Sequence, residues 1–342
     1  MKAITYRSDC AEGVELSEMP HPMRASGEAL CRVVCSGVNP VDAKYLFGDK
    51  QPKFLAARGR KLVEGRIAGI DFAGVVEQVP EDCTHLKPGD PVFGTAPPGS
   101  GTFAEYVATP IHQVAHKPES LSFEEAAVLP LVGLTAIQSL QHDNGLGAGQ
   151  HLLLIGASGG VGHVALQVAK ALNARVTAIC SGKNRDLVTR LGADHVADYT
   201  EGFAILDSVL QEIIVDHGRF DLCLDCVSSL DAKDAACDYE AFVRQNHFLA
   251  GTYICIGGRP IDWFKAVVRR RFGVNLFGRD RELFWVRFPH SERALEQIAE
   301  IADAGKIRPK VAEVLPLSAE GARQAFAMLR GRRVAGKLAL RC

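Results

Sequence analysis

The sequence lacks an excess of charge of either sign. Its 39 Lys and Arg residues stand against 40 Asp and Glu residues, which leaves a formal net charge of −1 over 342 residues. A chain this close to neutrality has no general attraction to nucleic acid or to acidic membranes. The overall charge therefore predicts no nucleic-acid partner.

The sequence also lacks long hydrophobic runs and a recognisable leader. No stretch of about 18 apolar residues occurs, so no membrane span is predicted. The first residues, Met1 to Asp9, contain neither the apolar core of a signal peptide nor the Arg- and Ser-rich pattern of a transit peptide. We interpret them as the start of a first β-strand.

The ten cysteines lack the spacing of a disulfide framework. Most of them lie inside apolar runs, and we interpret them as reduced core thiols of a cytoplasmic protein. Cys223 and Cys226 form a CxxC pair, a spacing that also occurs in redox sites. The residues around this pair alternate as in a buried strand, which favours core packing over a metal or redox role.

The sequence does contain a change in the pattern of expected secondary structure near residue 120. The chain is long enough for two domains, with 342 residues of which 47% are hydrophobic. The first part reads as short strands between Gly- and Pro-containing turns, which predicts a barrel-like β domain. Ser122 and Glu125 have the spacing of a capping box and predict a helix start.

After residue 150, expected strands alternate with expected helices. This alternation predicts parallel βαβ units. The expected strands cover residues 152–155, 175–180, 195–198, 220–227 and 251–256. The expected helices cover residues 163–172, 186–191, 293–304 and 319–330, and a final strand follows the last helix.

A glycine-rich loop follows the first of these strands. It reads Gly156-Ala157-Ser158-Gly159-Gly160-Val161-Gly162, which matches GxGxxG with Ala157 in the first position. In this pattern Gly159 lets the backbone approach a pyrophosphate, and Gly162 lets the following helix pack against the strand. The N–H groups at the start of that helix bind the phosphates. The loop therefore predicts a dinucleotide-binding Rossmann domain.

The end of the second strand indicates which dinucleotide binds. NAD sites usually carry an Asp or Glu there for the ribose 2′-hydroxyl. Residues 179–185 contain no acid, but they contain Ser181, Lys183 and Arg185, which suit a 2′-phosphate. We therefore predict NADPH as the cofactor, with Ser181 and Lys183 as first contacts. Arg185 and Tyr199 are further candidates, each with an ordinary surface or strand-end side chain as the alternative.

Segments along nearly the whole chain resemble the medium-chain dehydrogenase/reductase superfamily, in its zinc-independent quinone oxidoreductase and enone reductase branch (ζ-crystallin-like). Besides the glycine loop, the segments are 37–42, 69–74, 87–94, 101–106, 133–136, 191–196, 303–309 and 336–337. The resemblance implies an α/β fold with two domains. A GroES-like β-rich catalytic domain would comprise residues 1–122 and 287–342, and a Rossmann NADP-binding domain residues 123–286. It also implies a homodimer.

The resemblance further implies a chain that works without zinc. By position, Asn39, Ile70 and Asp71 stand where the zinc-dependent members have a Cys, a His and a Glu. Isoleucine has no donor atom, and Asn is a poor zinc ligand. The structural zinc lobe expected after Gly94 is missing as well. No metal site is predicted, and the expected substrate is an acceptor that needs no Lewis acid, namely a quinone or an α,β-unsaturated carbonyl.

The resemblance also implies where cofactor and substrate bind. Asn39 and Thr135 are expected near the nicotinamide and its ribose. Lys44 is expected to polarise a carbonyl or protonate an enolate, with a surface lysine as the alternative, and Tyr45 is the second choice as proton donor. The remaining expected cofactor contacts are Val227, Gly257, Phe284, Val286 and Lys337.

Two basic segments leave alternatives open. Residues 50–66 are interpreted as a solvated loop, or as a loop that recruits an acidic substrate such as an acyl-CoA. Residues 267–272 are interpreted as a solvated turn, or as a patch for a partner or nucleic acid. The leading prediction is an NADPH-dependent reductase of quinones or enones. The alternatives are an enoyl-thioester reductase and an NADPH-binding protein with a structural or regulatory role and little catalysis.

Overall fold

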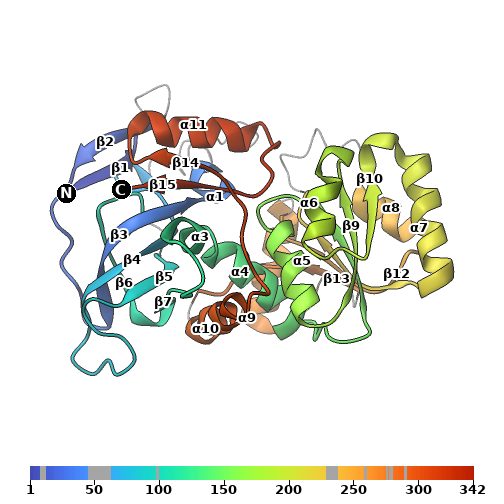
Figure 1. The fold of residues 1–342 in the computed structure, drawn as a ribbon, viewed down its shortest axis with the longest axis horizontal. Coiled ribbons are helices and arrows are strands. Elements are labelled where there is room, and N and C mark those ends of the chain that lie inside the picture. The colour runs from blue at the N-terminus through green and yellow to red at the C-terminus, as the bar shows by residue number, and fades with distance from the viewer. Residues whose placement is uncertain are drawn as a thin grey trace. The chain divides into compact units, whose positions relative to one another are not determined.

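The chain folds into two compact units in the computed structural model (Figure 1). The first unit comprises residues 1–134 and 287–342, and the second comprises residues 135–286. The chain passes from one to the other within helix α4 (Pro130–Ile137). The structure describes residues 1–7, 13–44, 63–97, 100–228, 238–257, 260–274, 276, 280–288 and 291–342.

The first unit is mainly antiparallel β-structure. In its described residues a two-stranded sheet pairs β1 with β2, and a seven-stranded sheet has the order β14-β15-β3-β4-β5-β7, with β6 also paired to β3. The strands are β1 (Lys2–Tyr6), β2 (Val14–Glu18), β3 (Glu28–Val38), β4 (Asp71–Gln78), β5 (Pro91–Thr95), β6 (Tyr106–Pro110), β7 (Val114–His116), β14 (Val311–Pro316) and β15 (Lys337–Arg341). Strand β15 lies near the C-terminus and pairs antiparallel with β3, so the last part of the chain joins the sheet formed by the first part.

Helices pack around this sheet structure. They are α1 (Pro40–Lys44), α3 (Phe123–Ala127), α10 (Glu292–Asp303) and α11 (Ala319–Arg330). The predicted capping box is confirmed at α3: the Ser122 hydroxyl accepts from the Glu125 N–H, and the Glu125 carboxylate accepts from the Ser122 N–H. On α11, Phe326 is buried and its ring lies 6.3 Å from that of Phe103.

The second unit is built on a six-stranded parallel sheet, counted over its described residues. The order is β10-β9-β8-β11-β12-β13. The strands are β8 (His151–Ile155), β9 (Arg175–Cys180), β10 (His195–Asp198), β11 (Phe220–Asp225), β12 (Leu249–Cys255) and β13 (Arg281–Leu283). The strand order reverses between β8 and β11, where Asp225 is level with Ile155. In open α/β sheets, ligands bind beyond the carboxyl ends of the strands at such a reversal.

Helices cover both faces of the parallel sheet. They are α5 (Gly162–Ala171), α6 (Arg185–Arg190), α7 (Phe203–His217), α8 (Tyr239–Gln245) and α9 (Pro260–Phe272). Figure 1 shows α5 and α6 on one face and α7 and α8 on the other. Right-handed crossovers produce this distribution, because the chain moves outward from β8 to β10 and then returns to β11. The predicted α/β class and the parallel βαβ units are confirmed.

Local differences separate the predicted elements from the observed ones. The run Val267–Phe272 was expected as a turn, but it forms the end of α9. Helix α7 was not predicted, although a parallel β10 and β11 on opposite sides of β8 require a long crossover between them.

The cysteines of the core are free thiols, as predicted. Those that are buried are Cys31, Cys35, Cys180, Cys223 and Cys255. Cys223 lies inside β11, so core packing accounts for the first residue of the CxxC pair. None of the helices in the described part of the chain combines the length and apolar character needed to cross a membrane.

Candidate functional site

The glycine loop leaves the sheet at the end of β8. All five residues of β8 are buried, and the chain then turns at Gly156, whose φ is +79°. A Cβ on Gly156 would lie 2.6 Å from Cγ2 of Val227, which follows the neighbouring strand β11. Glycine is therefore required here both by the backbone conformation and by the close approach of Val227.

Gly159 and Gly162 have different roles in the protein itself. A Cβ on Gly162 would lie 2.2 Å from the carbonyl oxygen of Gly156 and 2.8 Å from Cα of Ala157, so the close packing of α5 on the loop requires glycine. A Cβ on Gly159 would meet only that same oxygen, at 3.3 Å, and Gly159 does not have a positive φ. The protein's own packing therefore places little demand on Gly159, and the open space beside it fits a ligand that approaches the backbone.

Free hydrogen-bond donors surround this space. The N–H groups of Ser158, Gly160, Val161 and Gly162 find no acceptor among the described residues. They stand at the start of α5, where the helix dipole favours an anion. The buried His163 stabilises the loop, because its Nδ1 lies 2.8 Å from the Gly159 carbonyl oxygen. The loop thus fits the pyrophosphate of a dinucleotide.

A side chain missed by sequence reasoning links this loop to the end of β9. The Asn184 amide donates to the Ser158 hydroxyl at 3.0 Å and to the Ser181 hydroxyl at 3.2 Å. Ser181 and Asn184 are three residues apart, so their contact was available from local spacing. The contact with Ser158 was not, because it depends on β9 lying beside β8.

The predicted 2′-phosphate contacts gather around the short helical segment Gly182–Asn184. Ser181 is buried, whereas Lys183 and Arg185 are exposed and Tyr199 is 44% exposed. Arg185 donates to the Val196 carbonyl oxygen at 3.1 Å. In the described residues Lys183 has no carboxylate within ion-pair distance. Two exposed cations therefore stand at the end of β9.

A carboxylate from the adjacent strand also lies here, and sequence reasoning did not consider it. Asp198 ends β10, and its Oδ2 lies 2.2 Å from where a Cβ on Gly182 would stand. Burial acts to raise its pKa, but hydrogen bonds from Thr200 and from the Gly182 N–H, together with Arg185, hold the pKa of Asp198 below its usual value. Asp198 is thus an ionised group that accepts a hydrogen bond from the Gly182 N–H.

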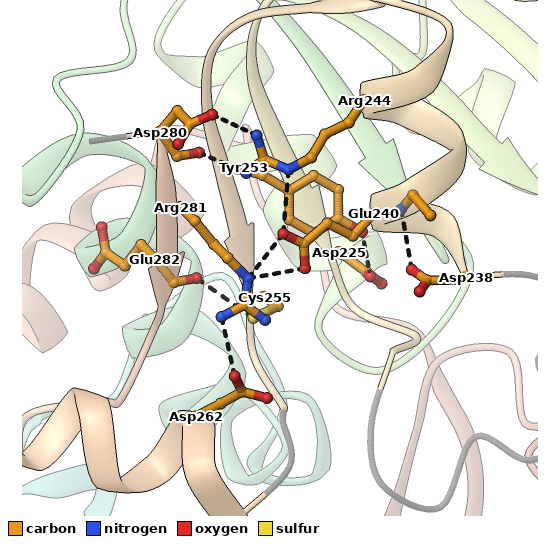
Figure 2. Close-up of polar contacts among 11 residues, drawn as sticks. Asp225, Asp238, Glu240, Arg244, Tyr253, Cys255, Asp262, Asp280, Arg281 and Glu282 are labelled. Atoms are coloured by element: carbon orange, nitrogen blue, oxygen red, sulfur yellow. Dashed lines mark hydrogen bonds and ion pairs between the residues drawn. The ribbon is translucent and has the colours of Figure 1, made fainter. Parts of the chain in front are cut away.

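The turn after β11 is held by a buried carboxylate. Asp225 Oδ1 accepts from the N–H groups of Val227 at 2.8 Å and Ser228 at 2.9 Å. Its Oδ2 accepts from the Tyr253 hydroxyl at 2.6 Å, as Figure 2 shows. Burial, with the nearby Cys223 and Asp225, raises the pKa of Tyr253 far above its usual value, so the hydroxyl remains a donor. These bonds fix Val227 against Gly156.

An ion-pair network connects the last strands of this sheet to helices α8 and α9 (Figure 2). Arg281 Nε lies 2.8 Å from each carboxylate oxygen of Glu240, and Arg281 Nη1 lies 3.3 Å from Asp262 Oδ1. Arg244 also pairs with Glu240, at 3.2 Å. The network holds β13 beside β12, where the Phe284 N–H donates to the Cys255 carbonyl oxygen at 2.8 Å.

The other expected contacts of this unit follow these strands. Gly257 comes after β12 and is buried, Phe284 comes after β13 and is 3% exposed, and Val286 is half-buried. Thr135 lies in α4 and is 7% exposed, with its carbonyl oxygen accepting from the Ser139 hydroxyl at 2.6 Å. Val227, Gly257 and Phe284 thus share the carboxyl edge of the sheet with the glycine loop.

In the first unit, a buried polar cluster surrounds Asn39. The Asn39 side-chain amide donates to Asp71 Oδ2 at 2.9 Å, and its oxygen accepts from the Lys337 ammonium. Lys337 also donates to the Val38 carbonyl oxygen at 2.9 Å. The second Asp71 oxygen accepts from the Leu131 N–H at 3.0 Å. Asn39, Asp71 and Lys337 are at most 3% exposed, so these bonds fix the orientation of the Asn39 amide.

A second carboxyl group completes this cluster. Asp42 Oδ2 accepts from the Asn39 N–H at 2.7 Å, whereas Oδ1 is buried without a hydrogen-bond partner. Burial raises the pKa of Asp42 to about 8 and that of Asp71 to about 6. Burial also lowers the pKa of Lys337, although both carboxyl groups oppose this shift. Asp42 therefore holds a proton that an exposed aspartate would release.

Comparison with known proteins agrees with both units. The alcohol dehydrogenase GroES-like domain matches residues 25–119, and the zinc-binding dehydrogenase family matches residues 191–340. The mitochondrial NAD(P)H oxidoreductase RTN4IP1 of Homo sapiens is 32% identical over 324 residues, which cover 85% of this chain and 76% of that protein. The chain belongs to the medium-chain dehydrogenase/reductase superfamily, in its quinone oxidoreductase branch.

Two further similarities concern proteins with named activities. The trans-enoyl reductase pgmF of Aspergillus terreus is 32% identical over 327 residues, which cover 91% of this chain and 85% of that protein. The structure of the quinone oxidoreductase from Coxiella burnetii superposes with a TM-score of 0.78 at 25% identity, covering 100% of this chain and 99% of that chain. As a member of this superfamily and branch, the chain is an oxidoreductase that works with a nicotinamide cofactor.

Asn39, Ile70 and Asp71, which by resemblance stand at the zinc position of metal-dependent members, can be tested as a donor set for zinc. The Asn39 amide is occupied by Asp71 and Lys337, and Ile70 is a buried apolar side chain. An ammonium beside these groups repels a cation. This donor set does not fit zinc. Elsewhere in the described residues, no three His, Cys, Asp or Glu side chains are arranged to hold a metal ion.

Two expected catalytic groups lie outside what the structure describes. Lys44 ends α1, but its side chain is not described, and Tyr45 lies wholly outside the described residues. Of the basic segment 50–66, only residues 63–66 are described, and Arg66 is exposed. Lys337, expected to contact the cofactor, has its ammonium in the buried Asn39 cluster.

Substitutions at the two glycines separate packing from cofactor binding. We expect Gly162→Ala to lower the free energy of unfolding of the second unit by about 1–3 kcal/mol, because its Cβ collides with backbone. Gly159→Ala should change that stability little and raise the Kd for NADPH roughly tenfold by crowding the loop donors. Both Trp residues lie in this unit, so Trp fluorescence during denaturation and NADPH titration measure the two effects. Equal destabilisation by both substitutions would contradict the distinction.

Substitution of Asp42 tests the buried cluster. Because its folded pKa of about 8 exceeds the ordinary 3.8, the folded chain retains a proton that the unfolded chain releases, and stability falls as pH rises between these values. We expect Asp42→Asn, which resembles the protonated acid, to reduce this fall. Hydrogen exchange of peptides from residues 1–134 measures it, with the exposed Asp82→Asn as control. An unchanged pH slope would show that Asp42 is ionised in the folded protein.

Proposed function

We propose that this chain is an NADPH-dependent, zinc-independent reductase that transfers hydride to a quinone or an α,β-unsaturated carbonyl. The observation that carries the proposal is the Asn39 cluster, in which an amide held by Lys337 and Asp71 replaces a metal-ligand set. Reduction of a simple ketone, or oxidation of an alcohol, needs strong stabilisation of an alkoxide, which zinc supplies in metal-dependent enzymes. Conjugated acceptors need less, because the negative charge spreads over their own π-system.

The residues of this chain bind and orient the cofactor and the acceptor in this proposal. Reduced nicotinamide, when bound, supplies the hydride. The N–H groups of the glycine loop hold the pyrophosphate, and Ser181, Lys183 and Arg185 hold the 2′-phosphate. The orientation of the Asn39 amide is fixed before any ligand binds, which lowers the cost of positioning the nicotinamide ribose. Lys44 is assigned as the group that polarises or protonates the acceptor, with Tyr45 as the second choice.

The choice of NADPH rests on charge at the end of β9. Lys183 and Arg185 are exposed there, and the nearby Asp198 is already bonded by Thr200 and by the Gly182 N–H. A carboxylate engaged in this way is a weaker acceptor for a ribose hydroxyl than a free one. The cations remain available for a 2′-phosphate, which favours NADPH over NADH.

A second candidate function is the reduction of an enoyl thioester. It is supported by the similarity to the trans-enoyl reductase pgmF, which extends over 91% of this chain. Chemically the two functions are close, because hydride adds to a conjugated carbon–carbon bond in both. They differ in the acceptor, so one assay separates them.

We expect purified protein to oxidise NADPH with at least one acceptor from a panel of benzoquinone, phenanthrenequinone, methyl vinyl ketone and crotonyl-CoA. Loss of NADPH absorbance measures the rate, and added zinc or a zinc chelator should leave it unchanged. A fast reaction with crotonyl-CoA alone would select the enoyl-thioester function. Tight NADPH binding without turnover of any acceptor would instead support a binding role, and zinc-dependent alcohol oxidation would contradict the proposal.

Removing one cation at the end of β9 tests the cofactor preference. We expect Lys183→Ala to raise the KM for NADPH roughly tenfold and to leave the KM for NADH unchanged, because only NADPH has the 2′-phosphate. Steady-state kinetics with both cofactors measure this, with the exposed Lys87→Ala as a matched control. Equal effects on both cofactors would remove Lys183 from the 2′-phosphate site.

A further inference from the structure

Helix α9 presents apolar side chains to solvent. Ile261 is 51% exposed, Phe264 60%, Val267 45% and Phe272 72%. Their spacing of three, three and five residues keeps them on the outer half of the helix. The opposite side, which includes Asp262 and Ala266, is buried against the second unit. The outer half of α9 is therefore apolar where a helix on a protein surface is usually polar.

Neighbouring residues extend this apolar surface. Val274 is 49% exposed, Leu276 45% and Trp285 41%. The Trp285 ring packs edge-to-face on Trp263 of α9, with ring centroids 5.7 Å apart. We call these three residues and the four exposed apolar residues of α9 the α9 patch. Exposed apolar side chains gathered on one helix and the segments beside it are typical of an interaction site.

The charged residues of segment 260–276 are nearly all basic. Between Pro260 and Leu276 the sequence contains Lys265, Arg269, Arg270 and Arg271 and a single acid, Asp262. The Asp262 carboxylate is buried and lies 3.3 Å from Arg281, so it does not neutralise the surface. Arg269 and Arg271 are exposed, and only Arg269 has a described carboxylate nearby, Glu282 at 3.8 Å. A chain with net charge −1 thus concentrates positive charge on one helix.

We propose that the α9 patch docks this protein on an anionic lipid surface. Aromatic and aliphatic side chains beside Lys and Arg are the composition of helices that lie in the membrane interface. The apolar side chains would enter the boundary between headgroups and acyl chains, while the arginines reach anionic headgroups. This surface binding is compatible with the lack of a membrane-spanning helix in the described residues.

A second copy of the chain fits the α9 patch less well. In a two-fold symmetric dimer the same patch meets itself. The exposed Arg269 and Arg271 of both copies would then share one interface, and the segment 260–276 has no exposed carboxylate to balance them. An anionic surface satisfies both the apolar side chains and the charges. The proposal goes beyond the reductase activity and does not depend on it.

Flotation of the full chain with lipid vesicles tests this docking. We expect the protein to float with phosphatidylcholine vesicles that contain phosphatidylglycerol, and not with phosphatidylcholine alone. Added salt should weaken the binding, because it screens the charges. Arg271→Gln should lower the partition coefficient about fivefold, and Phe264→Gln combined with Phe272→Gln should lower it roughly tenfold or more.

A matched control separates binding through the α9 patch from nonspecific adsorption to vesicles. Val215 is 81% exposed on α7, and Val215→Gln should leave vesicle binding unchanged. All variants should keep the wild-type Tm, which shows that they are folded, and their turnover of a quinone dissolved in water tests the reductase activity separately. Absence of flotation with anionic vesicles, or equal loss in Val215→Gln, would overturn the docking. Light scattering that shows a dimer dissociated by Phe264→Gln, without vesicle binding, would assign the patch to a second copy instead.

Discussion

The close approach of α5 to β8 is the constraint on which the cofactor region depends. Gly162 leaves no room for a Cβ beside the Gly156 carbonyl oxygen, so the helix begins immediately against the strand. The start of this helix has N–H groups without an acceptor among the described residues, and such groups favour an anion. The strand reversal between β8 and β11 then brings Val227 over Gly156, and Asp225 fixes it there through hydrogen bonds to the turn and to Tyr253.

The first unit holds Asn39 by buried polar contacts instead. Asn39 lies between an ammonium and a carboxylate, and all of them are buried. A buried charge is costly unless it is paired, so the loss of any one of Lys337, Asn39 and Asp71 would leave a buried polar group without its partner. Both the amide nitrogen and the amide oxygen of Asn39 are therefore already engaged by buried partners of this chain.

Acidic and basic residues balance over the whole chain, but they do not balance within the segment 260–276. The totals of acidic and basic residues nearly cancel, and from them no attraction to an acidic surface was predicted. The structure shows that one helix carries the exposed Arg269 and Arg271 together with exposed apolar side chains, while Asp262 is buried and pairs with Arg281. Residues 267–272 were interpreted as a turn, and the side chains of a turn have no common face. The grouping of apolar side chains on one face of α9 was therefore missed.

The sequence by itself determined the features that depend on residue type and short spacing. The glycine loop, the alternation of strands and helices, the capping box at Ser122 and the lack of a donor atom in Ile70 were all visible without coordinates. Only the tertiary structure decided which distant residues meet: Asn184 with Ser158, Val227 with Gly156, Asp198 with Gly182, and Lys337 with Asn39, which are 298 positions apart. The physical reason is that such contacts depend on strand order and register, which long-range packing selects and no local pattern encodes.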